Sequence, residues 1–193
     1  RFPHWLNRDR VRLYAAAVLF AELLFMFVYL ARVHWSQTSL PEPLAQDVAP
    51  IWGAARLAAH GLGINAWNLP SLFEVEKVAL PLMNAGNGSL PWLYPPTMLM
   101  FVLPLGWLPY MFAVVLWLGA TYALFVTTIR ATVQREGALL CALAFPGAFL
   151  AVIVGQTSLL TATLAGVGLL TLNRRPVIAG ICFGLLTMKP QMA

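Results

Sequence analysis

The run LYAAAVLFAELLFMFVYLA, residues 13–31, decides the fold class of this chain. It holds 19 residues and a single charged side chain, Glu22. At about 1.5 Å of rise per helical residue, such a run just spans the hydrocarbon core of a bilayer. A carboxyl group at mid-span is costly in lipid, so Glu22 should face protein or water. We expect it to form a helix–helix hydrogen bond, with the lining of a transport pathway as the alternative.

The composition of the whole chain also indicates lipid as its solvent. Hydrophobic residues make up 60% of the 193 residues, charged residues only 10%, and the mean hydropathy is +0.76. A soluble domain usually carries about 25% charged residues. The net charge of +5 does not indicate nucleic acid as a partner, because the arginines are dispersed and no basic run contains interleaved aromatics. Dispersed arginines in a membrane chain set topology instead.

The first apolar run follows a basic N-terminus, which contains Arg1, Arg8, Arg10 and Arg12. This charge bias predicts a cytoplasmic N-terminus, so residues 32–96 should form an external loop. That loop is the only long polar segment, and it holds four of the seven acids: Glu42, Asp47, Glu74 and Glu76.

Two short helices are predicted within the external loop. Pro50 suits the first turn of a helix that runs to about His60 and stops at Gly61. The sequence SLFE places Glu74 three residues after Ser71, which is the spacing of a capping box and predicts a second helix start at Ser71. Both helices read as amphipathic, which is typical of helices that lie in the membrane interface.

From residue 97 onward the chain is nearly all apolar, and further spans are expected over residues 97–191. Gly180 and Gly184 form a GxxxG pattern, which predicts a helix-packing face. The last apolar run stops soon after MKPQ, so we expect the sequence to be a fragment cut at the C-terminus. The predicted apolar segments are 97–108, 110–129, 138–154, 157–172 and 177–188.

The arginines between these segments raise a conflict in the topology. They form two pairs one hairpin apart, Arg130 with Arg135 and Arg174 with Arg175, so both pairs should share a side. Charge bias places that side in the cytoplasm, whereas two crossings over residues 97–129 would place it outside. Either residues 97–108 re-enter the same side, or the charge rule fails here.

The candidate chemistry centres on Asp47. The chain has no Walker A loop, no GxGxxG, no HExxH and no metal-spaced Cys/His cluster, so we expect no cofactor and no metal. A carboxylate at the membrane surface can act as a general base towards a hydroxyl, and partial desolvation raises its basicity. The alternative is that Asp47 only favours the positive end of the following helix, with Arg56 and His60 on a solvated face of that helix.

Four segments in order resemble the family 87 glycosyltransferases: QDVAPIWGAARLAAHG (46–61), YPPTMLMFVLPLGWLP (94–109), GQTSLLTATLAGVGLL (155–170) and RRPVIAGICFGLLTMKPQ (174–191). The resemblance covers nearly all of residues 11–191 and the N-terminal half of such an enzyme. It implies an all-α integral membrane protein, a multi-span GT-C-type helical bundle with amphipathic juxtamembrane helices in the first external loop. Residues 1–193 would then be the N-terminal part of a single membrane glycosyltransferase domain.

The resemblance also implies roles for individual residues. Asp47 matches the acid in the first external loop that acts as catalytic base, and Lys189 matches the lysine of KPQ, where a cation would hold a phosphate. Gln156 matches the GQ position and would bind a sugar or phosphate, and Tyr94 belongs to the YPP element. Arg56 and His60 join this set from the residue pattern alone, because they share one face of the helix that follows Asp47. The expected substrate-binding residues are therefore Arg56, His60, Tyr94, Gln156 and Lys189.

Each of these roles has a plainer alternative. Lys189 near a span end would simply snorkel to the interface, and Gln156 would cap the turn between two spans. One position departs from the family pattern: Asn68 stands where members often carry the acid of a Tyr-Asp-Pro type segment. This departure puts a second acidic contact to the sugar in doubt.

The implied function is the transfer of a sugar, mannose by resemblance, from a polyprenyl-phosphate donor to a hydroxyl of a lipid or glycan acceptor, with inversion. The expected place is the external face of a bacterial inner membrane. The partners would be the donor, the acceptor and the lipid bilayer. The alternative functions are a multi-span transporter or flippase, and a non-catalytic membrane assembly subunit.

Overall fold

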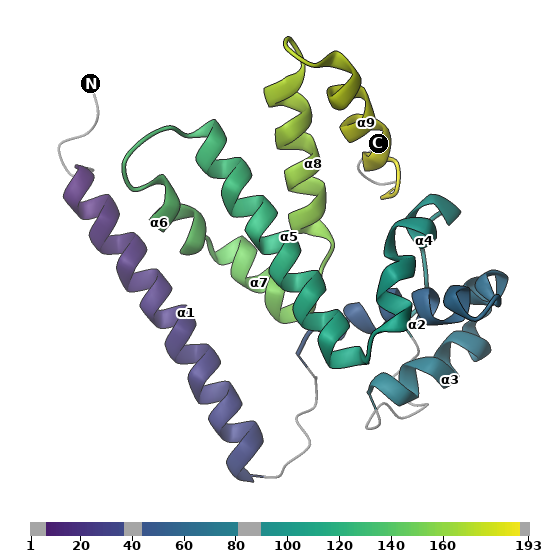
Figure 1. Ribbon diagram of the computed structural model, residues 1–193. Coiled ribbons are helices and arrows are strands. Elements are labelled where there is room, and N and C mark those ends of the chain that lie inside the picture. The colour runs from purple at the N-terminus through teal and green to yellow at the C-terminus, as the bar shows by residue number, and fades with distance from the viewer. Residues whose placement is uncertain (1–6, 37–43, 81–89, 190–193) are drawn as a thin grey trace.

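The computed structural model describes residues 7–36, 44–80 and 90–189, and its regular structure in these ranges is entirely helical (Figure 1), which confirms the all-α prediction. The elements are α1 (Arg8–Ser36), α2 (Val48–Ala59), η1 (Gly63–Trp67), α3 (Leu69–Ala79), α4 (Pro96–Val102), η3 (Leu103–Trp107), α5 (Tyr110–Thr132), α6 (Ala138–Leu143), α7 (Pro146–Val154), α8 (Ser158–Thr171) and α9 (Pro176–Leu186).

Within the described ranges, two helices are long and apolar enough to cross a membrane: residues Arg8–Arg32 of α1 and Tyr110–Thr132, which is α5. The predicted span over residues 138–154 is broken into α6 and α7, because Pro146 has no N–H to continue the first helix and begins the second. Helices α8 and α9 have 14 and 11 residues, so they are shorter than the ~20 residues that a bilayer requires.

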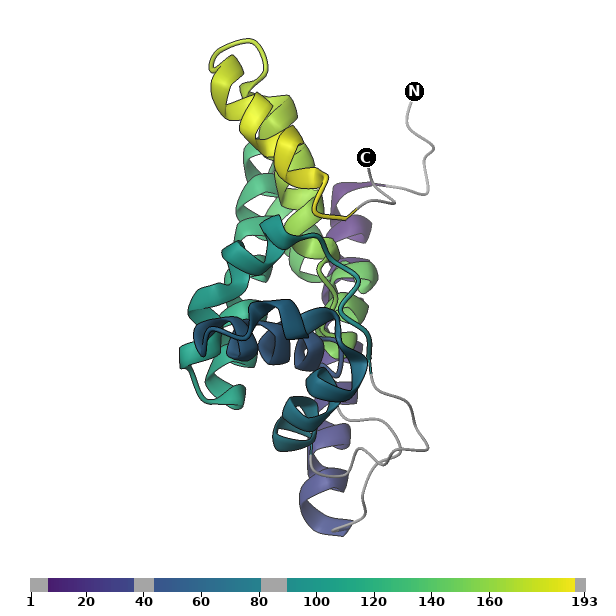
Figure 2. The ribbon, with the colours of Figure 1, turned by 90° about the vertical axis from the view of Figure 1, so that its right-hand side faces the viewer.

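Helix α2 differs from its prediction, because it is a core helix and not an amphipathic surface helix. Ile51 is 1% exposed and Trp52 4% exposed, and Ala54 and Ala55 are completely buried. Besides α3 and η1, the later segments α4 and η3 also pack against α2 (Figure 2). In α3 the two buried residues are Leu72 and Glu76, whereas the apolar Val78 is exposed, so its buried face is not purely apolar.

The tightest approach of two backbones occurs where η3 meets α2. A Cβ atom at Gly106 would lie 2.3 Å from the Ala55 carbonyl oxygen, so no larger residue fits there. The Trp52 indole also donates a hydrogen bond to the Leu108 carbonyl oxygen at 2.9 Å. These contacts fold the apolar segment over residues 96–107 back onto α2, so it does not run through the bundle as a separate span.

The path of this segment bears on the position of the arginines. The N-terminal end of α1, the α5–α6 loop and the α8–α9 loop all lie at one end of the molecule, and α2 and α3 lie away from it (Figure 1). At that end Arg12 pairs with Glu136 at 2.9 Å. Both arginine pairs therefore share a side with the basic start of α1, as the charge rule requires.

Helix α3 begins at Leu69 and not at Ser71, so its predicted start was wrong by two residues. Helix α3 is capped by Asn68, whose Oδ1 accepts the Ser71 backbone N–H at 3.1 Å and the Ser71 hydroxyl at 3.0 Å. Asn68, the residue that departs from the family pattern, is thus the N-cap of α3.

The predicted packing face at the GxxxG pattern was wrong. Cβ atoms at Gly180 and Gly184 would meet nothing within 4 Å, whereas one at Gly168 would meet the Phe183 ring of α9.

We predict that Gly106→Ala destabilises the protein by at least about 2 kcal/mol, because the new methyl group overlaps backbone atoms that cannot move aside. Gly180→Ala is the matched control, since it fills open space in a helix and should stabilise by about 0.5–1 kcal/mol. Thermal unfolding in detergent measures both. Equal midpoints for Gly106→Ala and the unmodified protein would show that the α2–η3 contact is absent.

Candidate active site

Four separate segments converge near the first turn of α2. Asp47 immediately precedes α2, Tyr94 lies in the extended segment before α4, Gln156 and Thr157 form the turn between α7 and α8, and Lys189 follows α9. Asp47 Oδ2 accepts a hydrogen bond from Gln156 Nε2 at 3.1 Å, across 109 residues of sequence. The structure thus brings together four of the six predicted site residues.

Backbone hydrogen bonds fix Asp47 against the end of α7. The Ala45 N–H donates to the Ile153 carbonyl at 2.6 Å, and the Asp47 N–H donates to the Val154 carbonyl at 3.0 Å. The last carbonyl groups of a helix have no partner within that helix, so these two bonds satisfy groups that would otherwise need water. We call this pair of bonds the 45–47 clasp.

The clasp requires glycine at position 155. Gly155 has φ +89°, and a Cβ atom there would lie 2.8 Å from the Val48 side chain and 2.9 Å from the Ala45 carbonyl oxygen. Only glycine adopts this backbone without strain and leaves room for the opposing chain. Ala45 has φ +57°, the one positive value among non-glycine residues in the described ranges, so the segment before Asp47 is itself strained.

Asp47 does not behave as a helix cap. Its backbone is helical, with φ −68° and ψ −9°, and its side chain makes no capping hydrogen bond to α2. The carboxylate instead turns to Gln156 in the α7–α8 turn. Asp47 therefore makes no capping bond, although it still lies at the positive end of α2, as the alternative from the sequence has it.

The surroundings of Asp47 change the pKa of its carboxyl group. Burial raises the pKa of this carboxyl group, and the hydrogen bond from Gln156 and the positive charge of Lys189 partly oppose that rise. A higher pKa means that the carboxylate binds a proton more strongly than an exposed aspartate does. Gln156 and Lys189 favour the charged form of this carboxyl group.

Tyr94 lies near Asp47. Its hydroxyl shares a hydrogen bond of 3.3 Å with the Thr157 hydroxyl, and its ring packs 4.9 Å from that of Trp92. Burial, and next the negative charge of Asp47, raise the pKa of Tyr94, so the phenol stays neutral and can donate a hydrogen bond. Sequence analysis missed Thr157, although its place beside Gln156 in the tight GQT turn was a usable signal.

Arg56 and His60 lie elsewhere, towards the other end of α2. Nine residues separate Asp47 from Arg56, which is about 14 Å along a helix. Arg56 Nη1 donates to the Gly106 carbonyl at 3.1 Å, and its guanidinium lies 5.7 Å from the Trp52 ring centroid. His60 Nδ1 lies 2.8 Å from the Arg56 carbonyl oxygen and must donate a proton to it. Arg56 thus holds the α2–η3 contact, whereas His60 bonds only to the backbone of its own helix, and neither is linked to Asp47.

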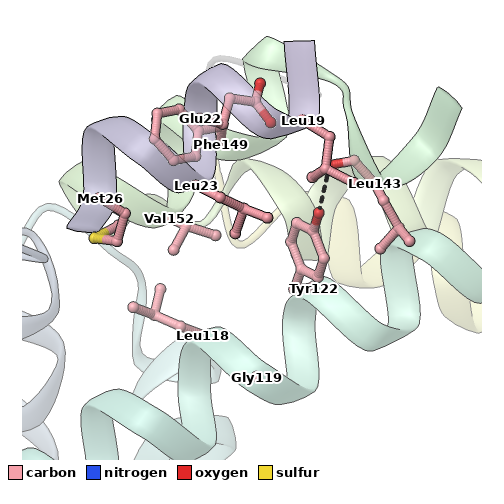
Figure 3. A pocket seen from close by; sticks show the side chains of 10 residues that line it. All are labelled: Leu19, Glu22, Leu23, Met26, Leu118, Gly119, Tyr122, Leu143, Phe149 and Val152. Atoms are coloured by element: carbon pink, nitrogen blue, oxygen red, sulfur yellow. Dashed lines mark hydrogen bonds between the residues drawn. The ribbon is translucent and has the colours of Figure 1, made fainter. Parts of the chain in front are cut away.

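Glu22 borders a different space, a cavity of about 330 Å³ between α1 and helices α5, α6 and α7 (Figure 3). Glu22 is 8% exposed, and its Oε1 has no hydrogen-bond partner among the residues that the structure describes. The expected helix–helix bond is not formed by that oxygen, and the nearby Tyr122 hydroxyl donates to the Leu143 carbonyl at 2.9 Å instead. The remaining walls are almost entirely apolar, which does not suit a pathway for polar solutes.

Three of the four residues that meet in this site lie in a segment that matches a known family. The family model of glycosyltransferase family 87 matches residues 92–193. The chain belongs to glycosyltransferase family 87. The match contains Tyr94, Gln156 and Lys189, whereas Asp47 precedes it. Comparisons with curated proteins and with solved structures found no match.

This membership confirms the resemblance drawn from the sequence and shows a glycosyltransferase. A glycosyltransferase uses a sugar donor and an acceptor, and the two long apolar helices accord with a membrane protein. In the ranges described by the structure, no three His, Cys, Asp or Glu side chains gather where they could hold a metal ion.

We predict that Glu22→Leu raises the midpoint of thermal unfolding in detergent, because it removes a buried carboxyl oxygen that has no partner. Sugar transfer should be unchanged, since Glu22 lies on a different helix and lines a cavity that contains no residue of the Asp47 site. Glu22→Gln is the control, because it keeps a polar group at the same place. A lower midpoint for Glu22→Leu would show that the carboxyl group has a stabilising partner.

Proposed function

We propose that this glycosyltransferase moves a sugar from a polyprenyl-phosphate donor to a hydroxyl group of a lipid or glycan, with Asp47 as general base. The observation that carries the proposal is the half-buried Asp47 carboxylate, held by Gln156 and facing the charge of Lys189 in a family 87 enzyme. Mannose as the sugar rests on the family resemblance alone.

The reaction balances with these groups. Asp47 takes the proton of the acceptor hydroxyl while the hydroxyl oxygen forms a bond to the anomeric carbon of the sugar. The bond from that carbon to the phosphate oxygen breaks, and its electron pair leaves with the polyprenyl phosphate. Attack opposite to the leaving group inverts the anomeric centre. The products are the glycosylated acceptor, a protonated Asp47 and the free polyprenyl phosphate.

Lys189 is the candidate contact for the donor phosphate. It lies close enough to Asp47 to lower the pKa of that carboxyl group, so a phosphate beside Lys189 would sit near the base. An ammonium group stabilises the negative charge that develops on a leaving phosphate. Pro190 and Gln191, the rest of the KPQ segment, lie outside the described residues.

The arrangement supports an external site. Asp47 binds the α7–α8 turn, at the end of α8 opposite to the loop with Arg174 and Arg175. If the arginine-rich end is cytoplasmic, as charge bias predicts, Asp47 faces the other side of a bacterial inner membrane. A lipid-anchored donor delivers its sugar at that surface without a nucleotide site. The transporter alternative is not favoured, because the family is one of glycosyltransferases.

We predict that Asp47→Asn lowers sugar transfer by about 10²–10⁴-fold, because the amide cannot accept the acceptor proton. The assay is transfer from a polyprenyl-phosphate mannose by the full-length protein in lipid nanodiscs. Asp9→Asn, which changes an exposed acid of α1, is the matched control and should transfer normally. The base assignment is wrong if Asp47→Asn transfers at the normal rate.

We predict that Lys189→Ala moves the acid limb of the kcat/KM profile to higher pH. The positive charge of Lys189 lowers the pKa of Asp47, so its removal raises that pKa, and the base is then lost at a higher pH. Lys77→Ala, at an exposed pair with Glu74, should leave the limb in place. A limb that stays or moves to lower pH in Lys189→Ala contradicts the proposed proximity.

A further inference from the structure

The side chain of Gln156 is not needed for the turn in which it lies. Backbone groups close that turn, because the N–H groups of Gly155 and Gln156 both donate to the Ala151 carbonyl, at 2.9 and 2.8 Å. The side chain therefore takes no part in closing the turn, and its amide donates a hydrogen bond to Asp47 Oδ2. This geometry does not support the alternative in which Gln156 only caps the turn.

The same turn holds both the backbone and the side chain of Asp47. The Asp47 N–H donates to Val154, two residues before Gln156, while Oδ2 accepts from Gln156 itself. Because the Asp47 backbone N–H and its carboxylate are both hydrogen-bonded to this region, rotation of the carboxylate about its side-chain bonds is restricted. Within the described ranges, the other carboxylate oxygen, Oδ1, has no hydrogen-bond partner.

The chemical type of the partner also matters. A cation bonded directly to Oδ2 would stabilise the carboxylate strongly and weaken it as a base, whereas a neutral amide orients it at a smaller electrostatic cost. An aspartate has about four lone-pair sites on its two oxygens, so one bond from Gln156 leaves Oδ1 able to accept a proton.

We infer that Gln156 is a positioning residue, whose amide fixes Oδ2 of Asp47 so that Oδ1 meets the hydroxyl group of the acceptor. This inference rests on the proposed function, because it requires Asp47 to be the base. It assigns Gln156 to the base and not to the sugar or phosphate. The next residue, Thr157, holds Tyr94 in the same way, so one turn aligns both sides of the site.

The test compares Gln156→Ala with Gln134→Ala, a control at an exposed glutamine after α5. We expect Gln156→Ala to lower kcat about tenfold or more, since a misplaced base reacts poorly, with KM for polyprenyl-phosphate mannose and for the acceptor changed less than about twofold. The acid limb of the profile should also move to higher pH, because a hydrogen bond to the charged form is lost. Gln134→Ala should leave all three quantities unchanged.

Gln156→Glu is the second variant, because it keeps the size of the side chain and remains informative if the alanine variant fails to fold. Its carboxylate beside Asp47 should move the acid limb to higher pH and lower kcat. A raised KM for the donor or the acceptor with unchanged kcat would overturn the inference and make Gln156 a substrate ligand. Unchanged kinetics and an unchanged acid limb would overturn it as well.

Asp47→Asn, measured beside these variants, separates the two levels of the account. If Asp47→Asn retains transfer, the proposed function fails, whatever Gln156 does. If Asp47→Asn is inactive and the Gln156 variants keep a normal acid limb, only the positioning role fails.

Discussion

The site depends on the 45–47 clasp, the pair of backbone hydrogen bonds that ties the residues before α2 to the last carbonyl groups of α7. The clasp joins the first polar segment to a turn more than a hundred residues later. It forms only because Gly155 takes a positive φ and offers no side chain to the opposing backbone. In the turn that follows this glycine, Gln156 bonds to Asp47 and Thr157 bonds to Tyr94.

The burial of α2 affects the pKa of Asp47, the residue that precedes it. Small residues along this helix, with Gly106 opposite, let α3 and η3 pack closely around it. The first turn of α2 is therefore covered by protein, and the carboxyl group of Asp47 is partly removed from water. The same aspartate at the start of an exposed helix would be an ordinary solvated acid and a weaker base. The packing around α2 thus accounts for the raised pKa of Asp47.

The sequence predicted the long helices and several residues of the site, but not how those residues meet. Apolar runs located α1 and α5, and the glycine after His60 located the end of α2, because these signals are local. The break at Pro146 was visible in the sequence and was overlooked. The pairing of Asp47 with Gln156 has no periodicity to reveal it, since it depends on how distant segments pack. For the same reason Arg56 and His60 were grouped with Asp47 by nearness in sequence. Arg56 instead contacts Gly106 and Trp52, and His60 contacts the Arg56 carbonyl oxygen.

The most direct test of the clasp is cysteine cross-linking in native membranes. Cys141 and Cys182 are first replaced by alanine, and Asp47→Cys is combined with Gln156→Cys. A short thiol-reactive bifunctional reagent should join these two positions efficiently, whereas Arg56→Cys with Gln156→Cys should not react, because Arg56 lies about 14 Å further along α2. Both outcomes are read as a shift in gel mobility. Failure of the 47–156 pair, or equal reaction of the 56–156 pair, would contradict the account.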